Sequence, residues 1–314
     1  MPIGRAIPPA ETRIPWTAIF NAFTRPAGNF KDELSNYLDV DHCILGESAR
    51  ALLFKLLETR KTQDGGQRDE VVIPGYTCYS VAASIVKAGL KINVYDLDPA
   101  TLQPDFNSLR DATSEKTLAI IFQHLFGIPT SGYEFKKLAQ ETGVAVIEDA
   151  AQALGGSIDT HHLGTIGDFG FYSFGRGKPL PIGGGGALIG KNNDILSELE
   201  MKVSKQGYFS LLSTALTQIM SKPSIYWLPE MLPLGLGETI FDTGFDTSAM
   251  QSVVQNLAEN SMDTLDDLNA HRRDIAKTYE EAFDDDCVIP IPEGGSAVYT
   301  RFPLMATKPG PLPG

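Results

Sequence analysis

The chain has 314 residues, of which 42% are hydrophobic and 21% charged, a balance typical of folded globular proteins and not of disordered or fibrous ones. Its 26 lysine and arginine residues are outnumbered by 39 aspartate and glutamate residues, so the net charge is −13. Without a basic cluster, this charge argues against a protein that binds nucleic acid through its phosphates.

The cysteines and the N-terminal residues indicate a compartment. Cys43, Cys78 and Cys287 are widely spaced and form no CxxC pair, which argues against a disulfide framework or a zinc site and favours a reducing compartment. The first residues carry proline and charge where a signal peptide would be apolar. The longest uncharged stretch, residues 206–221, is too short and too polar to span a bilayer. We therefore expect a cytoplasmic protein with no membrane span.

From residue 41 to residue 190, short β-branched runs alternate with stretches of helical periodicity, which is typical of parallel strands joined by crossover helices. Strands are predicted at residues 42–45, 71–74, 92–97, 118–123, 144–149, 169–174 and 187–190. Helices are predicted at residues 49–60, 79–89 and 131–143, with Gly89 and Gly143 as stop signals. The pattern predicts an α/β fold with an open, mostly parallel sheet flanked by helices.

The character of the sequence changes after Gly190. Residues 191–206 look helical, and residues 207–243 form an excursion rich in leucine, proline and aromatic residues, interpreted as a lid, a dimer contact, an interfacial segment or a core-packed insertion. Residues 250–283 read as one long charged helix. We expect a large domain over residues 1–245, and over residues 246–314 the start of a smaller C-terminal domain that is incomplete.

Lys178 is the sharpest chemical feature of the sequence. It follows a predicted strand and a tight glycine-containing turn, and it precedes four glycines, Gly183 to Gly186. A lysine held beside bare backbone can lose its proton and form a Schiff base with an aldehyde cofactor. The alternative is a solvated loop lysine.

Two acidic residues, Glu148 and Asp149, end the strand predicted at residues 144–149, and Gln152 follows them. A carboxylate at the end of a buried strand is costly unless it is paired. An aspartate that faces a protonated pyridine nitrogen would be paired, and it would keep a pyridoxal phosphate (PLP) ring an electron sink. The alternatives are a helix-capping or a metal-ligating aspartate.

Ser48, Ala49 and Arg50 lie between the first strand and its helix. Free backbone amides at a helix start bind phosphate without requiring a basic protein. The segment matches neither GxGxxG nor the P-loop pattern, which argues against a nucleotide-binding loop. The alternative is an ordinary N-cap formed by Ser48.

Together these features resemble the DegT/DnrJ/EryC1/StrS sugar aminotransferases, which have the aspartate-aminotransferase fold of PLP enzymes (fold type I). The resemblance is carried by residues 71–105, 118–130, 146–156 and 167–190. It implies that Lys178 anchors PLP, that Asp149 binds the pyridine nitrogen and that Gln152 lies beside the ring hydroxyl.

The resemblance assigns further cofactor and substrate contacts. Ser173 would join Ser48, Ala49 and Arg50 on the phosphate. Cys78 takes the ring-stacking position, which is usually aromatic in the family, or it is a small buried hydrophobe. Tyr76 and His124 are candidate substrate or ring contacts, although a structural histidine is an equal interpretation of His124. Adjacent His161 and His162 invite a metal interpretation, but with no third ligand we predict no metal site.

The resemblance implies a PLP-dependent aminotransferase. It would move an amino group from an amino acid, often glutamate, to a keto sugar that is often nucleotide-linked, in polysaccharide or natural-product biosynthesis. It also implies a homodimer, although residues 246–250 lack the asparagine that family members donate to the partner's phosphate site. The rival hypotheses are a PLP-binding protein without turnover, truncated or regulatory, and another PLP reaction on the same fold.

Overall fold

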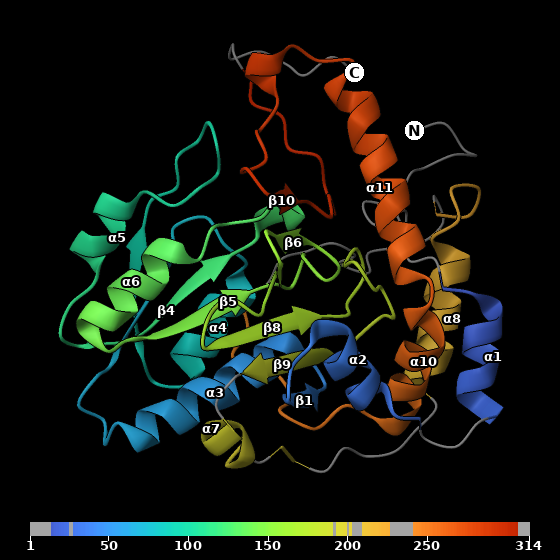
Figure 1. Cartoon of the computed structure of the whole chain (residues 1–314). Helices are drawn as coiled ribbons and strands as arrows, with labels where there is room; N and C mark the ends of the chain where they lie inside the picture. Colours follow the sequence, from blue (N-terminus) through green and yellow to red (C-terminus); the bar gives the residue numbers. More distant parts are fainter. Residues whose placement is uncertain are drawn as a thin grey trace.

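The computed structural model describes residues 14–24, 28–190, 193–199, 201–202, 209–226 and 241–306. Its centre is a seven-stranded sheet with the order β1-β9-β8-β5-β4-β2-β3 (Figure 1). The strands are β1 (His42–Gly46), β2 (Glu70–Pro74), β3 (Lys91–Tyr95), β4 (Thr117–Gln123), β5 (Ala145–Asp149), β8 (Phe169–Ser173) and β9 (Gly186–Gly190). All seven predicted strands are therefore present.

The sheet is mostly parallel, as predicted, with one antiparallel member. Strands β3, β2, β4, β5 and β8 pair in parallel, whereas β9 runs antiparallel to both of its neighbours, β8 and β1. The prediction of parallel strands was wrong for β9. The physical reason is its connection, because residues 174–185 link β8 to β9 as a loop without the crossover helix that a parallel return requires.

One face of the sheet is covered by α3 (Ala49–Gln63), α4 (Tyr79–Lys87) and α7 (Asn193–Ser197). Leu52 and Leu56 of α3 pack there with Val71 and Ile73 of β2. The predicted helix stops are confirmed, since Gly143 ends a helix in the left-handed region with φ 71° and Gly89 has φ 65°. The packing of α3 and α4 on this face places the first residues of both helices beside the carboxyl ends of the strands.

Alternate side chains of the same strands point to the opposite face. There α5 (Phe106–Ala112) and α6 (Tyr133–Thr142) cover one half, where Phe135 and Leu138 meet Val72 of β2 and Val146 of β5. The other half is covered by α1 (Trp16–Thr24), α2 (Phe30–Leu38) and α10 (Ser252–Met262). The result is a sheet with helices on both faces.

Two helical predictions need correction. The single helix expected at residues 250–283 is two helices, α10 and α11 (Leu265–Glu280), that meet at Asp263 and Thr264. The Thr264 hydroxyl donates to the Ser261 carbonyl at 2.7 Å, and α10 stays buried in the core while α11 leaves it. At residues 191–206 only α7 is helical in the described part, because Lys202 then runs extended beside Ser248.

The hydrophobic excursion is described only in part. Residues 209–226 and 241–243 are seen, whereas 207–208 and 227–240 lie outside the described residues. Helix α8 (Phe209–Met220) lies next to the start of α1, where the Gln218 side chain bonds both the N–H and the carbonyl of Ile14 at 3.0 and 2.9 Å (Figure 1). Among the described residues, no helix is long and apolar enough to cross a membrane.

After α11 the chain returns to the sheet. Residues 285–287 form a short 3-10 turn, and β10 (Gly295–Ser296) pairs with β6 (Ser157–Ile158), which in turn pairs with β7 (His161–His162). The Val298 N–H then donates to the Gly127 carbonyl at 3.0 Å, and the Thr300 N–H donates to the Phe126 carbonyl at 2.9 Å. These bonds bring residues 298–301 to the edge where β4 and β5 end.

Candidate active site

A cavity of about 270 Å³ opens where β4, β5 and β8 end and where α3 and α4 begin. This is the position at which parallel α/β sheets bind ligands. The residues that line it are Ser48, Ala49, Arg50, Leu53, Cys78, Tyr79, Ser80, Val81, Gln123, His124, Leu125, Asp149, Ala151, Gln152, Phe171, Ser173 and Lys178. Tertiary structure thus gathers every residue predicted for the site except Tyr76.

Lys178 enters the cavity from the loop between β8 and β9. The turn before it is tight, since Gly177 has φ 71° and the Lys178 N–H donates to the Gly175 carbonyl at 3.3 Å. Burial lowers the pKa of the Lys178 amine, and the nearby Asp149 carboxylate acts in the opposite direction. The amine is therefore held among protein groups, unlike the solvated loop lysine of the alternative.

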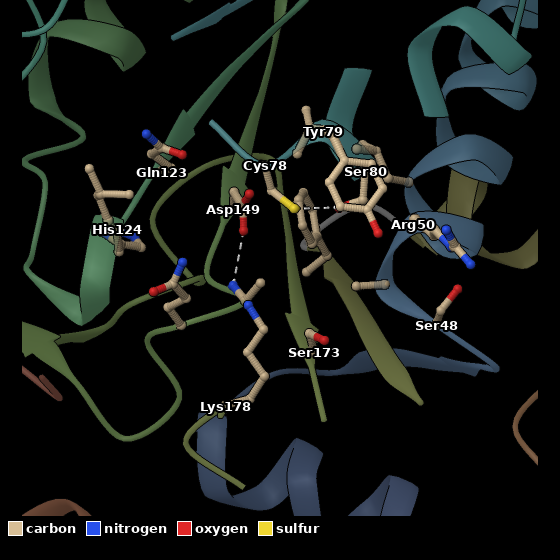
Figure 2. Close-up of a pocket in the computed structure, with 17 residues that line it drawn as sticks. Ser48, Arg50, Cys78, Tyr79, Ser80, Gln123, His124, Asp149, Ser173 and Lys178 are labelled. Carbon is tan, nitrogen blue, oxygen red and sulfur yellow. Dashed lines mark hydrogen bonds between the residues drawn. The ribbon is translucent and has the colours of Figure 1, made fainter. Parts of the chain in front are cut away.

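Asp149 faces Lys178 across the cavity from the end of β5 (Figure 2). Its side chain is 8% exposed, and its Oδ1 accepts the Ala151 N–H at 3.0 Å. Burial raises the pKa of this carboxyl, and Lys178 is the first of the groups that lower it. No helix begins at Asp149, unlike in the helix-capping alternative. Among the described residues, no group of three or more His, Cys, Asp or Glu side chains could hold a metal ion.

The start of α3 forms another wall of the cavity. The Ser48 hydroxyl accepts the Ala51 N–H at 3.3 Å and caps the helix, so the ordinary N-cap is present. The amides of Ala49 and Arg50, at the first helical positions, have no carbonyl one turn earlier to bond. Ser173, at the end of β8, also lines the cavity. The wall can therefore present amide and hydroxyl groups to an anion.

Cys78 stands at the start of α4 and lines the cavity. Its side chain is exposed, so the alternative of a small buried hydrophobe is wrong, and its sulfur accepts the Ser80 hydroxyl at 3.0 Å. Tyr79 and Ser80 beside it also line the cavity. Tyr76 does not; its side chain is 62% exposed and tilts toward Phe126, with ring centroids 6.5 Å apart.

His124 borders the cavity, but its ring nitrogens both have protein partners. The Thr130 N–H donates to Nδ1 at 3.0 Å, so the proton of a neutral ring is on Nε2, which lies 2.8 Å from Glu148 Oε2. Glu148 is fully buried and also accepts the N–H groups of Gly164 and Gly167 at 2.9 and 2.6 Å. The geometry favours the structural interpretation of His124.

Gln152 has a partner that the sequence did not suggest. The Thr300 hydroxyl donates to Gln152 Oε1 at 2.9 Å, across 148 positions of sequence. The neighbouring Arg301 is near enough to lower the pKa of Lys178. Neither residue lies in a recognisable motif, and only the return of the chain after α11 brings them here.

Other cavity residues were also missed. Gln123 ends β4, and its side-chain amide donates to the Tyr76 carbonyl, while Phe171 lies on β8. Both belong to strands that were predicted. The signal that could have found Gln123 is its position as the last residue of an apolar strand, where ligand-facing side chains concentrate.

Comparison with known proteins identifies a family. The model of the DegT/DnrJ/EryC1/StrS aminotransferase family matches residues 24–308. L-glutamine:2-deoxy-scyllo-inosose aminotransferase of Streptomyces kanamyceticus is 33% identical over 175 residues, which is 56% of this chain and 39% of the relative. UDP-N-acetyl-3-dehydro-alpha-D-glucosamine 3-aminotransferase of Acidithiobacillus ferrooxidans is 33% identical over 147 residues, 47% of this chain and 38% of the relative.

The chain therefore matches about two fifths of the length of these curated relatives. Among solved structures, E. coli GDP-4-keto-6-deoxy-D-mannose-3-dehydratase with bound hydrated PLP superposes with a TM-score of 0.74. The alignment has 16% identity and covers 98% of this chain and 81% of that one. At that identity the likeness shows the fold, which is the fold expected from the sequence.

Proposed function

The chain belongs to the DegT/DnrJ/EryC1/StrS aminotransferase family, and on that basis we propose that it is a PLP-dependent aminotransferase acting on a keto sugar. The observation that carries the proposal is a half-buried lysine and a buried carboxylate that line one cavity beside a helix start. The names of the two curated relatives, a cyclitol and a sugar aminotransferase, support the substrate class.

The residues present fit the cofactor. Asp149 is a buried carboxylate whose pKa burial raises, and a pyridinium N–H is a cationic donor that would favour its ionised form. The start of α3, with Ser48, Ala49, Arg50 and nearby Ser173, supplies amide and hydroxyl donors for a phosphate. In this assignment Lys178 would hold the aldehyde carbon, Gln152 would lie beside the ring hydroxyl and Cys78 would contact a ring face.

The protein's own groups have defined tasks in this proposal. Bound PLP supplies an electron sink for a carbanion next to nitrogen. The lowered pKa of Lys178 makes its Nζ available as a nucleophile and then as a base that takes a proton from the donor's α-carbon. Asp149 would hold the ring nitrogen protonated. Both ring nitrogens of His124 are hydrogen-bonded to protein groups, so in this proposal the ring supports the wall of the cavity and does not transfer a proton.

Finer features of the proposal rest on the resemblance. We propose an amino-acid donor such as glutamate, a nucleotide-linked keto sugar as acceptor, and a homodimer. The three free cysteines support a reducing compartment such as the cytoplasm.

The test is the absorption spectrum of the purified protein with PLP, followed by borohydride reduction and peptide mapping. We expect a visible band that reduction fixes onto Lys178. Lys178→Ala should abolish transamination with every amino donor. A variant that keeps wild-type turnover would disprove the assignment of Lys178. A wild-type protein that binds PLP but never aminates it would instead indicate cofactor binding without catalysis.

A further inference from the structure

Helix α11 reaches the backbone that carries Lys178. Arg272 Nη2 donates to the Lys178 carbonyl at 3.3 Å, and Nη1 donates to the Pro179 carbonyl at 3.2 Å. The guanidinium is partly buried, and burial lowers its pKa. An arginine stays charged in proteins, so both are charge-assisted bonds from one rigid fork.

One turn earlier on the same helix, Asn269 completes the connection. Its Oδ1 accepts Arg272 Nη1 at 2.7 Å, and its Nδ2 donates to the Leu154 carbonyl at 3.0 Å. Leu154 lies in the turn that follows Asp149 and Gln152. Asn269 is 1% exposed, so its bonds are sheltered from water. Arg272 and Asn269 therefore tie the loop of Asp149 to the loop of Lys178.

The Lys178 loop lacks regular secondary structure, although Leu180 and Ile182, which follow the lysine, are 1% exposed and packed in the core. Residues 174–185 contain neither helix nor strand, and Gly177, Gly183 and Gly185 all have positive φ angles. Glycines at such positions leave the unbound chain many conformations. A side-chain fork that bonds two successive carbonyls restricts the direction in which the lysine leaves the backbone.

We propose that Arg272 is a positioning residue for Lys178 and that Asn269 orients it. The proposal rests on the proposed function in one respect, the role of Lys178 as the cofactor anchor. The contacts of Arg272 are with the carbonyls of Lys178 and Pro179, so its proposed action is on the position of the backbone that carries the amine. Small displacements of a reacting group are costly, because reaction requires close and aligned atoms.

The first test needs no cofactor. Hydrogen–deuterium exchange is compared in wild type, Arg272→Lys, Arg272→Met and Arg273→Met, the last being a control at the adjacent position of α11. In both Arg272 variants, we expect faster exchange in peptides covering residues 175–182 and unchanged exchange in peptides from β2 and β4. Wild-type exchange of residues 175–182 in Arg272→Lys and Arg272→Met would overturn the proposal. Arg272→Lys keeps the positive charge, so its hydrogen–deuterium exchange can be measured even if Arg272→Met does not fold.

The second test uses PLP itself. We expect both Arg272 variants to bind PLP at least about tenfold more weakly than Arg273→Met and to be labelled more slowly at Lys178 by PLP and borohydride. Equal affinity and labelling in the Arg272 variants and Arg273→Met would overturn the inference and leave the proposed function standing. If the wild type takes no PLP at Lys178, the proposed function fails, while the exchange experiment still decides whether Arg272 orders the loop.

Discussion

Lys178 and Asp149 lie in the same cavity, and each favours the charged form of the other. Burial disfavours the charged form of both groups, which lowers the pKa of the lysine and raises that of the aspartate. Each then partly restores the charge of the other. Perturbed titration of this kind is typical of functional sites.

This coupling predicts a pH effect in the cofactor-free protein. The pKa of Asp149 is raised in the folded protein, so between the two pKa values folded Asp149 keeps a proton that the unfolded chain has released. The free energy of unfolding therefore falls as the pH rises from the pKa of Asp149 in the unfolded chain to its pKa in the folded protein. Lys178→Met removes the main group that lowers the pKa of Asp149, so that fall should extend to higher pH. Each added unit of pKa difference corresponds to about 1.4 kcal/mol.

The measurement is urea unfolding of wild type and Lys178→Met between about pH 4 and pH 8. The double variant Lys178→Met, Asp149→Asn is the matched control, because it lacks the titrating carboxyl and should lose the extra slope. Parallel stability curves for wild type and Lys178→Met would show that the two groups are not coupled.

At the scale of elements, the last two residues of β5 point to opposite faces of the sheet. Asp149 points into the cavity, whereas the preceding Glu148 points to the other face, as alternation along a strand requires. There Glu148 gathers the N–H groups of Gly164, Ile166 and Gly167 and the ring of His124. One carboxylate thereby joins β5, the end of β4 and the loop before β8.

Replacing this carboxylate should therefore destabilise the fold. In Glu148→Gln, one acceptor oxygen becomes an NH₂ group that faces donors, and the groups left unpaired are buried. We expect a loss of about 2 to 4 kcal/mol in the free energy of unfolding. The control is Glu58→Gln on α3, whose side chain is 48% exposed and pairs with Lys55; it should change stability by less than about 0.5 kcal/mol. Equal midpoints of chemical denaturation for both variants would refute this role.

At the scale of the whole molecule, α1 and α8 present an apolar surface. Trp16 and Phe20 of α1 and Leu212 and Leu216 of α8 are 51% to 67% exposed, and neither helix contains a charged residue. Exposed apolar side chains that form a contiguous patch are typical of protein contacts. We propose this surface as the subunit interface if the chain forms the homodimer that the resemblance implies.

Sedimentation velocity at micromolar concentration tests this assignment. The wild type should sediment as a dimer, and Phe20→Asp or Leu216→Asp should shift it toward monomer, since a buried unpaired charge opposes association. Val94→Asp, an equally exposed apolar position on the edge strand β3, should remain dimeric. A monomeric wild type would contradict the homodimer, and dimeric Phe20 and Leu216 variants would place its interface elsewhere.

The sequence alone predicted the seven strands, because they depend on local pattern, and the class of site, through the resemblance of its motifs to a known family. Alternating apolar runs specify seven strands, and polar residues at strand ends specify where chemistry gathers. Glycines marked helix ends, because the left-handed backbone conformation that ends a helix depends on the residue at that position. The cavity residues Lys178, Asp149 and Ser48 could be predicted because each follows a strand whose end is fixed in the fold.

Tertiary structure alone decided what depends on distant contacts. Gly170 reads as an ordinary strand residue, yet a side chain there would collide with the Gly164 carbonyl. The bond from Thr300 to Gln152 and the fork of Arg272 on the Lys178 loop join residues 148 and 94 positions apart. The engaged nitrogens of His124 likewise depend on its neighbours in space. No local periodicity encodes such pairs, because they arise only when the chain folds back upon itself.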